Sequence, residues 1–150
     1  MIKEVKGDLL QATENIIGHQ VNCQGVMGAG LALQIKNKYP QAYKMYKTVT
    51  KFNDPQSLLG ISLIVKVDEN KYVANLFGQL NYGRNKKQYT DYEALNKALI
   101  ELKEYALNNN LTVALPHGLG CGLAGGDWNI VRNLIDKAFE DYEVTIYKID

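Results

Sequence analysis

Residue types that cross-link a chain or bind metals are scarce in this sequence. Its 150 residues include two cysteines, two histidines and one tryptophan. Cys23 and Cys121 both lie in glycine-rich segments, where a bridge between them is geometrically conceivable. The N-terminus lacks a signal peptide, which favours the reducing cytoplasm and free thiols. Because no CxxC or HExxH spacing occurs, we expect no metal site.

Excess charge of one sign and long apolar runs are also missing. The chain has 17 basic and 16 acidic residues, a net charge of +1, so nothing favours a nucleic acid or a membrane surface as partner. Lys86 and Lys87 form a short basic pair, for which a solvated loop is the simplest interpretation. No apolar run is long enough to cross a bilayer. With 46% hydrophobic and 22% charged residues, we expect residues 1–150 to form one domain with a substantial core.

Glycine, in contrast, is concentrated in two stretches. The first, residues 16–33, reads IIGHQVNCQGVMGAGLAL. Its start predicts a buried strand over residues 15–21, its middle a glycine loop, and its end the beginning of a helix. A strand, glycine loop and helix in this order direct backbone N–H groups and a helix N-terminus at a phosphate. The alternative is a tight strand-to-helix turn that binds nothing.

The second stretch, residues 116–128, reads PHGLGCGLAGGDW and follows a short apolar strand over residues 112–115. Its glycines predict a second anion-binding loop, and Asp127 is expected to cap the following helix. Since both loops follow central strands, we expect them to flank one crevice. Two backbone anion sites in one crevice suit a nucleotide diphosphate.

The rest of the chain alternates strands and helices. Thr90 and Glu93 form a capping box at the start of a helix, a turn at residues 68–71 predicts a hairpin, and residues 53–60 are expected to form a loop. The expected strands are residues 2–5, 15–21, 61–67, 72–77, 112–115 and 143–149, and the expected helices are 30–39, 41–51, 90–107 and 128–139. This order predicts a three-layer α/β/α fold around a central mixed sheet of about six strands.

Four polar positions have two interpretations each. His19 lies near the carboxyl end of its strand, where ligands of open α/β sheets collect, but a lone histidine in a strand is often structural. Asp8 can cap a turn or accept a hydrogen bond from a ligand amine. Tyr82 and Arg84 can stack on or pair with a nucleotide, or belong to a solvated loop over residues 78–88.

Five segments together resemble the macrodomain family, over essentially the whole chain. They are Gly7-Asp8 after the first strand, HQVNCQGVMGAGLALQ, LFGQ, PHGLGCGLAGGDW and the final IYKI. The combination is specific, whereas either glycine loop alone is a weak signal. The resemblance is greatest to the subgroup of ADP-ribose-1″-phosphate phosphatases and small ADP-ribosyl-glutamate hydrolases, and it implies a macrodomain-like fold.

The resemblance implies a binding site for ADP-ribose. Asp8, with Leu9 beside it, corresponds to the residue that hydrogen-bonds the adenine amine, and Ile149 to an apolar residue against the adenine. Asn22 corresponds to a residue near the distal ribose. The two phosphate loops correspond to Met27, Gly28, Ala29, Gly30 and Leu31, and to Leu119, Gly120, Cys121, Gly122, Leu123, Ala124 and Gly125.

The resemblance also implies chemistry at the distal ribose. His19 corresponds to the histidine of the phosphatase subgroup, which can activate water or protonate a leaving oxygen, and Asn22 would place the ribose. The implied activity is hydrolysis of a 1″ substituent, with phosphate favoured over an acyl or protein-linked ester. It needs no cofactor, and its partner is ADP-ribose, a 1″-substituted ADP-ribose or an ADP-ribosylated protein.

The hydrolase subgroup uses a lysine and an aspartate, and this chain has Gln79 and Ala124 at those positions. Lys86, Lys87 or Asp127 would have to replace them. This departure favours the alternative of a binding module that reads ADP-ribose without chemistry. A nucleic-acid binder is a third alternative, which the neutral charge disfavours.

Overall fold

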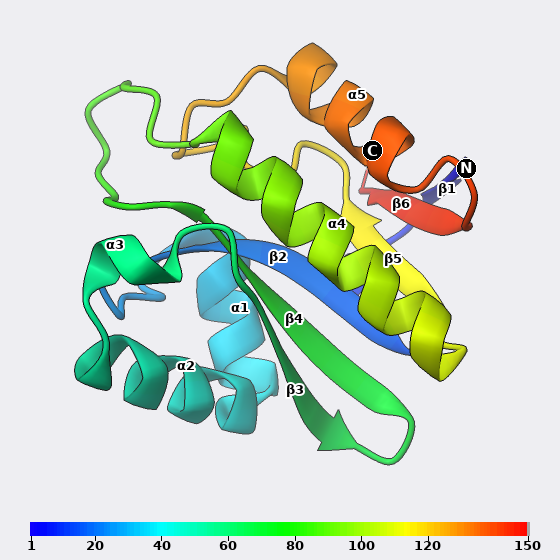
Figure 1. Cartoon of the computed structure of the whole chain (residues 1–150), viewed down its shortest axis with the longest axis horizontal. Coiled ribbons are helices and arrows are strands. Elements are labelled where there is room, and N and C mark those ends of the chain that lie inside the picture. The colour runs from blue at the N-terminus through cyan, green and yellow to red at the C-terminus, as the bar shows by residue number, and fades with distance from the viewer. Residues whose placement is uncertain (150) are drawn as a thin grey trace.

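One six-stranded sheet organises the protein. The computed structural model describes residues 1–149 (Figure 1). The strands are β1 (Ile2–Lys6), β2 (Ile16–Asn22), β3 (Ser62–Asp68), β4 (Lys71–Gln79), β5 (Val113–Pro116) and β6 (Val144–Lys148). The helices are α1 (Gly30–Lys38), α2 (Pro40–Phe52), α3 (Pro55–Leu58), α4 (Tyr92–Asn109) and α5 (Trp128–Ala138), with a 3-10 turn η1 (Leu9–Gln11). The predicted α/β fold with a mixed sheet of six strands is confirmed.

The strand order is β1-β6-β5-β2-β4-β3. Every neighbouring pair is parallel except β3 and β4, which form the predicted antiparallel hairpin. Five strands therefore end at the same edge of the sheet. The loops that follow β2 and β5, which carry the two glycine stretches, meet at that edge.

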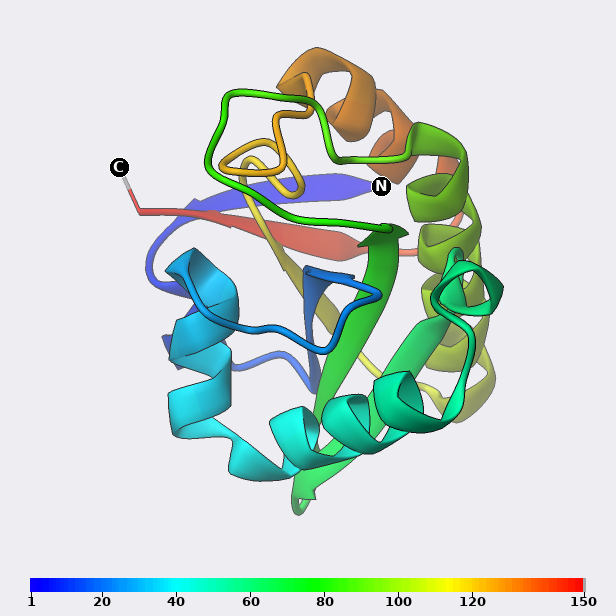
Figure 2. The same ribbon diagram turned by 90° about the vertical axis from the view of Figure 1, so that its left-hand side faces the viewer.

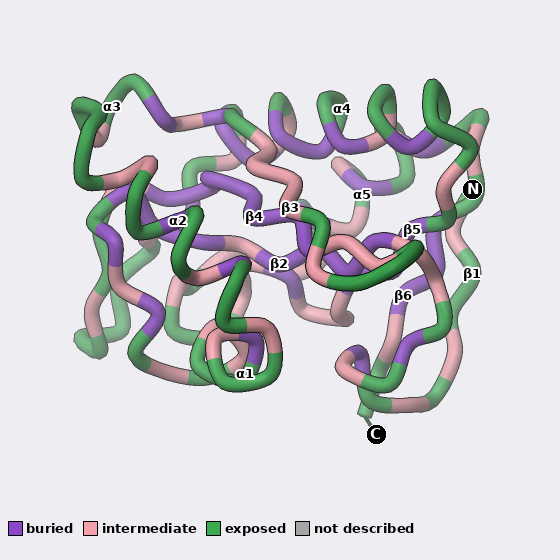
Figure 3. Tube along the Cα trace, turned by 90° about the horizontal axis from the view of Figure 1, so that it is seen from below, coloured by how far each residue is buried: buried purple, intermediate pink, exposed green. Residues whose placement is uncertain are grey.

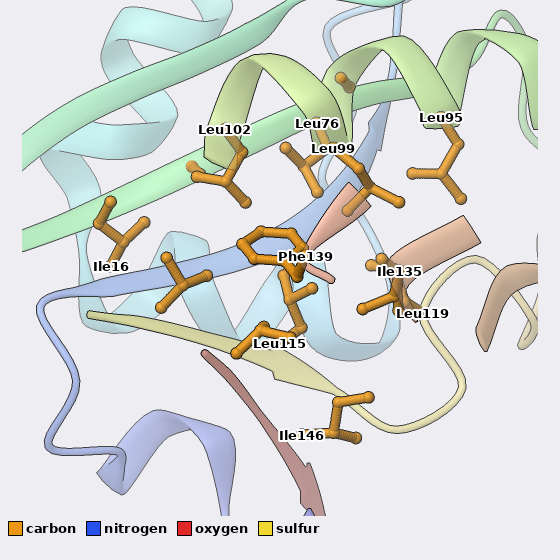
Figure 4. Packing of buried hydrophobic residues seen from close by; sticks show 14 of the residues in the cluster. Ile16, Leu76, Leu95, Leu99, Leu102, Leu115, Leu119, Ile135, Phe139 and Ile146 are labelled. Carbon is orange, nitrogen blue, oxygen red and sulfur yellow. The ribbon is translucent and has the colours of Figure 1, made fainter. Parts of the chain in front are cut away.

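Helices cover both faces of the sheet. Side chains alternate between the two faces along each strand, so each central strand contributes to the core on both sides. Ile16 faces the large cluster formed with α4 and α5, whereas the next residue, Ile17, faces a second cluster that contains Ile35 of α1. Figure 2 shows α4 and α5 on one side of the sheet and α1 and α2 on the other. Figure 4 shows the large cluster, in which Phe139 lies between α4 and β5. The central strands β2 and β4 are consequently buried along most of their length (Figure 3).

Two local predictions are wrong. The N-cap of α4 is Asp91, not Thr90: the Asp91 carboxylate accepts a hydrogen bond from Ala94 N at 3.0 Å. Thr90 instead pairs with Gln79 in an isolated β-bridge. Residues 53–60 are not simply a loop, because they contain the single helical turn α3. Pro55 is its first residue, a helical position where proline is well tolerated. Asp127 caps α5 as predicted, and its carboxylate accepts from Asn129 N at 2.9 Å.

No helix within residues 1–149 has the length and apolarity needed to cross a membrane.

Candidate functional site

A cleft of about 870 Å³ opens at the edge where the parallel strands end. Its walls are the ends of β2, β4, β5 and β6 together with the segments that follow these strands. Ligands of open α/β sheets bind at this edge, and the volume lies in the range of small-molecule sites. The cleft is therefore the candidate functional site.

The first glycine loop, residues 22–30, leads from β2 into α1. The Asn22 carboxamide closes its first turn: Oδ1 accepts from Gln24 N at 2.9 Å, and Nδ2 donates to Val26 O at 2.8 Å. Ala29, the N-cap of α1, has no side-chain cap to offer. The first backbone N–H groups of α1 thus lack a partner within the helix. Because residues 28–32 line the cleft, this helix end favours a negatively charged ligand group.

The second glycine loop, residues 117–126, leads from β5 toward α5. Its fold is held by backbone bonds from Gly126 N to Gly120 O at 2.9 Å and from Gly125 N to Gly122 O at 3.0 Å. Gly120 has a φ of +71°, and a Cβ there would lie 2.8 Å from Gln20 Oε1. Glycine is needed at this position for both reasons.

A polar network ties the second glycine loop to β2 and β4. Gln20 Nε2 donates to Gln79 Oε1 at 2.8 Å and to Thr90 Oγ1 at 2.9 Å, and Thr90 Oγ1 donates to Gly120 O at 2.6 Å. Backbone N–H groups of Tyr89 and Thr90 both donate to the carbonyl of Ala124. Gln79, which stands where the hydrolase subgroup is expected to have lysine, is engaged in this network and is 9% exposed.

His19, on β2, lines the cleft and is 1% exposed. Its Nε2 is 2.6 Å from Oδ1 of Asn75, its neighbour on β4. Since that oxygen can only accept, Nε2 carries the proton and Nδ1 keeps its lone pair. Nδ1 has no hydrogen-bond partner within residues 1–149. Burial lowers the pKa of His19 from 6.5 to about 4, against the opposing effect of Asn75, so the imidazole is neutral at pH 7.

The cleft is also lined by η1, which follows β1, and by the end of β6, on the β1–β6 side of the sheet. Asp8 caps η1, with Oδ1 accepting from Leu10 N at 3.0 Å, so the capping interpretation of this residue is confirmed. Leu9 is buried, and Ile149 is 71% exposed. Asp8, Leu9 and Ile149 all line the cleft, so this part of its lining contains a carboxylate and two apolar side chains.

Most residues predicted for the site lie in this cleft. From the first half of the chain it is lined by Asp8, Leu9, His19, Asn22 and residues 28–31, and from the second half by Leu119, Gly120, residues 122–124 and Ile149. Met27, Cys121 and Gly125 are not among the described lining residues. Met27 is buried in a cluster with Phe77, and the Cys121 thiol donates to Leu119 O at 3.3 Å.

The cleft has further lining residues for which the sequence gives two interpretations or predicts no role. Tyr82 and Arg84, considered as nucleotide contacts or as solvated loop, line the cleft. His117 and Gln20 do too, and the His117 ring lies 4.6 Å from the ring of Trp128. The place of His117 at the start of the second glycine loop was the available signal. Lys86, Lys87 and Asp127 are not among the described lining residues.

Both cysteines are free thiols. Burial raises the pKa of each to about 11, and for Cys121 the nearby Asp127 charge adds to the effect. Neither thiol is therefore activated as a nucleophile at neutral pH. Within residues 1–149 no group of three or more candidate metal ligands is found.

Two glycine loops that line one cleft at the strand ends of a mixed α/β sheet are typical of α/β domains that bind phosphorylated ligands. The macro domain family model matches residues 19–135, and the chain belongs to that family.

Two curated proteins and one solved structure illustrate the relationship. The chain is 30% identical over 181 residues to the ADP-ribose 1″-phosphate phosphatase of Debaryomyces hansenii, with all of both chains covered. It is 32% identical over 155 residues to the DNA ADP-ribosyl glycohydrolase of Mycobacterium tuberculosis, covering 98% of this chain and 42% of that protein. The macrodomain of M. tuberculosis DarG superposes with a TM-score of 0.82 at 29% identity, covering 98% and 97% of the two chains.

Proposed function

We propose that the protein binds ADP-ribose and hydrolyses a substituent from the 1″ position of its distal ribose, with phosphate as the favoured leaving group. The observation that carries this proposal is that both glycine loops and the N-terminus of α1 line one cleft of about 870 Å³. Two backbone anion sites in one cleft suit a diphosphate. The similarity to an ADP-ribose 1″-phosphate phosphatase and a DNA ADP-ribosyl glycohydrolase, whose names describe reactions of ADP-ribose derivatives, supports the proposal.

The two ends of the cleft suit the two ends of this ligand. At one end Asp8 uses Oδ1 to cap η1 and has Oδ2 for the adenine amine, while Ile149 covers the ring. At the other end Asn22 faces the distal ribose from the first glycine loop, and Arg84 lines the cleft. A guanidinium forms strong paired hydrogen bonds with phosphate oxygens, which suits a 1″-phosphate.

In the proposed reaction a water oxygen bonds to phosphorus, the bond from phosphorus to the ribose 1″ oxygen breaks, and that oxygen gains a proton. The loops hold the diphosphate in place and stabilise the charge that develops. His19 is neutral, so its role is to accept a hydrogen bond or a proton through Nδ1 rather than to donate one from an imidazolium. Because Gln79 is a carboxamide held by Gln20, no lysine adduct at this position forms part of the proposal.

Calorimetric titration tests the binding part. ADP-ribose should bind much more tightly than AMP, because AMP reaches only one end of the cleft, and ATP serves as a second control. Phosphate release from ADP-ribose 1″-phosphate then tests catalysis, with ADP-ribosylated glutamate peptide and ADP-ribosylated oligonucleotide as competing substrates. Absence of ADP-ribose binding would refute the site assignment, and release from the peptide or the oligonucleotide alone would refute the phosphate preference.

A non-catalytic reader of ADP-ribose is the second candidate. The burial of His19 favours it, because this residue exposes almost no surface to a substrate. A reader would bind ADP-ribose, including ADP-ribose attached to a protein, and would release nothing from any of the three substrates.

The free thiols agree with the cytoplasm as the site of action, which fractionation of the native cell would check.

A further inference from the structure

Asn22 is held by hydrogen bonds to both the oxygen and the nitrogen of its carboxamide. Oδ1 accepts from the backbone N–H groups of Gln24 at 2.9 Å and Val26 at 3.4 Å, while Nδ2 donates one hydrogen to Val26 O. These three bonds all lie within the turn of residues 22–26. They orient the carboxamide within the turn, but they would move with the turn if it shifted.

One further bond joins this carboxamide to a different element. The hydroxyl of Tyr46, on α2, lies 2.8 Å from Asn22 Oδ1 and 2.7 Å from Asn22 O, so its single proton is shared between the two oxygens. The Tyr46 ring is fully buried and stacks on Phe77 of β4, with ring centroids 5.8 Å apart. Because its ring is packed between α2 and β4, the Tyr46 hydroxyl has a fixed position and can hold the Asn22 carboxamide in one orientation.

We propose that Tyr46 is a positioning residue, which fixes the Asn22 carboxamide so that its remaining N–H donor meets the distal ribose. The inference rests on the proposed function. After the bond to Val26 O, Nδ2 has one hydrogen left, and Asn22 lines the cleft. Tyr46 itself is not among the described lining residues, so its effect on a ligand passes through Asn22.

The variant Tyr46→Phe removes the hydroxyl and keeps the ring. Lys47 still donates to Gly25 O at 3.2 Å, so the turn keeps a second bond to α2. Loss of one buried hydrogen bond corresponds to about a tenfold change in affinity, and we expect ADP-ribose to bind about tenfold more weakly. AMP does not reach Asn22, and its affinity should stay within about twofold.

Tyr43→Phe is the matched control. Tyr43 lies on the same helix with its ring 6.4 Å from that of Tyr46, but its hydroxyl forms no bond to Asn22. This variant should bind both ligands like the wild type. Urea unfolding of both variants shows whether they are folded at the titration temperature.

A double-mutant cycle separates positioning from general destabilisation. In an Asn22→Ala background, Tyr46→Phe should change ADP-ribose affinity by less than about twofold, because the group it positions is gone. Equal losses in both backgrounds, or an equal loss for AMP, would overturn the positioning role. Wild-type protein that binds no ADP-ribose would overturn the proposed function together with this inference, whereas normal binding by Tyr46→Phe would overturn the inference alone.

Discussion

His19 shows how a single buried side chain can limit the chemistry of a site. The imidazole is held through Nε2 by Asn75 and has a free lone pair on Nδ1. Its surroundings favour the neutral form, because burial removes the water that would stabilise a charge. Any catalytic role near neutral pH is therefore that of an acceptor.

The same burial links protein stability to pH. The unfolded chain binds a proton at His19 below pH 6.5, whereas the folded protein does so only near pH 4. Between these values the unfolded state holds more protons, so the free energy of unfolding falls as the pH is lowered, by roughly 3 kcal/mol in total from this residue. Urea unfolding at several pH values from 7 to 4 should show this loss in the wild type and not in His19→Gln.

A pH dependence that is unchanged in His19→Gln would contradict the assignment.

Sequence reasoning could identify residues such as His19 and Asn22 but not their surroundings. The position of His19 near a strand end followed from apolar neighbours. Its pairing with Asn75 depends on the register between β2 and β4, and the contact of Asn22 with Tyr46 joins residues 24 apart in sequence. Neither is encoded in a local pattern.

At the scale of elements, the second glycine loop and the segment that leads into α4 form one unit. Thr90 donates to Gly120 O through its side chain and to Ala124 O through its backbone. The capping pattern at Thr90 and Glu93 was recognised in the sequence, but Asp91 is the cap. The threonine serves the neighbouring loop instead, a role that depends on a contact 30 residues away.

Alanine substitutions in the second glycine loop should differ sharply in cost. Gly120→Ala forces a side chain into a left-handed conformation and against Gln20 Oε1, and should lower the free energy of unfolding by about 1–3 kcal/mol. A Cβ at Gly122 would meet no other atom within 4 Å, and the backbone there is not in the left-handed region. Gly122→Ala should therefore change stability by less than about 0.5 kcal/mol.

Chemical denaturation of the two variants beside the wild type gives this comparison. Equal stability of Gly120→Ala and Gly122→Ala would mean that the loop can relax around the added methyl group. That result would contradict the conclusion that the hydrogen bonds of Gln20 and Thr90 hold the loop in place.

At the scale of the whole molecule, the two faces of the sheet carry the core. The interleaved pattern of strands and helices predicted the layers and the hairpin. The order of strands in the sheet was not predictable in the same way, since it depends on which distant strands pair: β1 pairs with β6 across nearly the full length of the chain. The single turn α3 was also missed, because four residues are too few for a periodic signal.

Truncation of a core side chain tests the large hydrophobic cluster formed with α4 and α5. Phe139 is fully buried between α4, α5 and the sheet, so Phe139→Ala should lower the free energy of unfolding by about 3–5 kcal/mol. Phe52, at the end of α2, is 73% exposed, and Phe52→Ala should cost less than about 0.5 kcal/mol. Urea unfolding measures both, and a small loss for Phe139→Ala would contradict its place in the core.

The parallel pairing of β1 and β6 places the two ends of the described chain at opposite ends of the strands. Met1 O accepts from Val144 N at the start of β6, whereas Ile149 lines the cleft just beyond the end of that strand; Figure 2 shows this separation. A fluorophore attached at position 149 would therefore sit at the mouth of the cleft and report ligand entry. An affinity tag attached at the N-terminal end would leave that mouth clear.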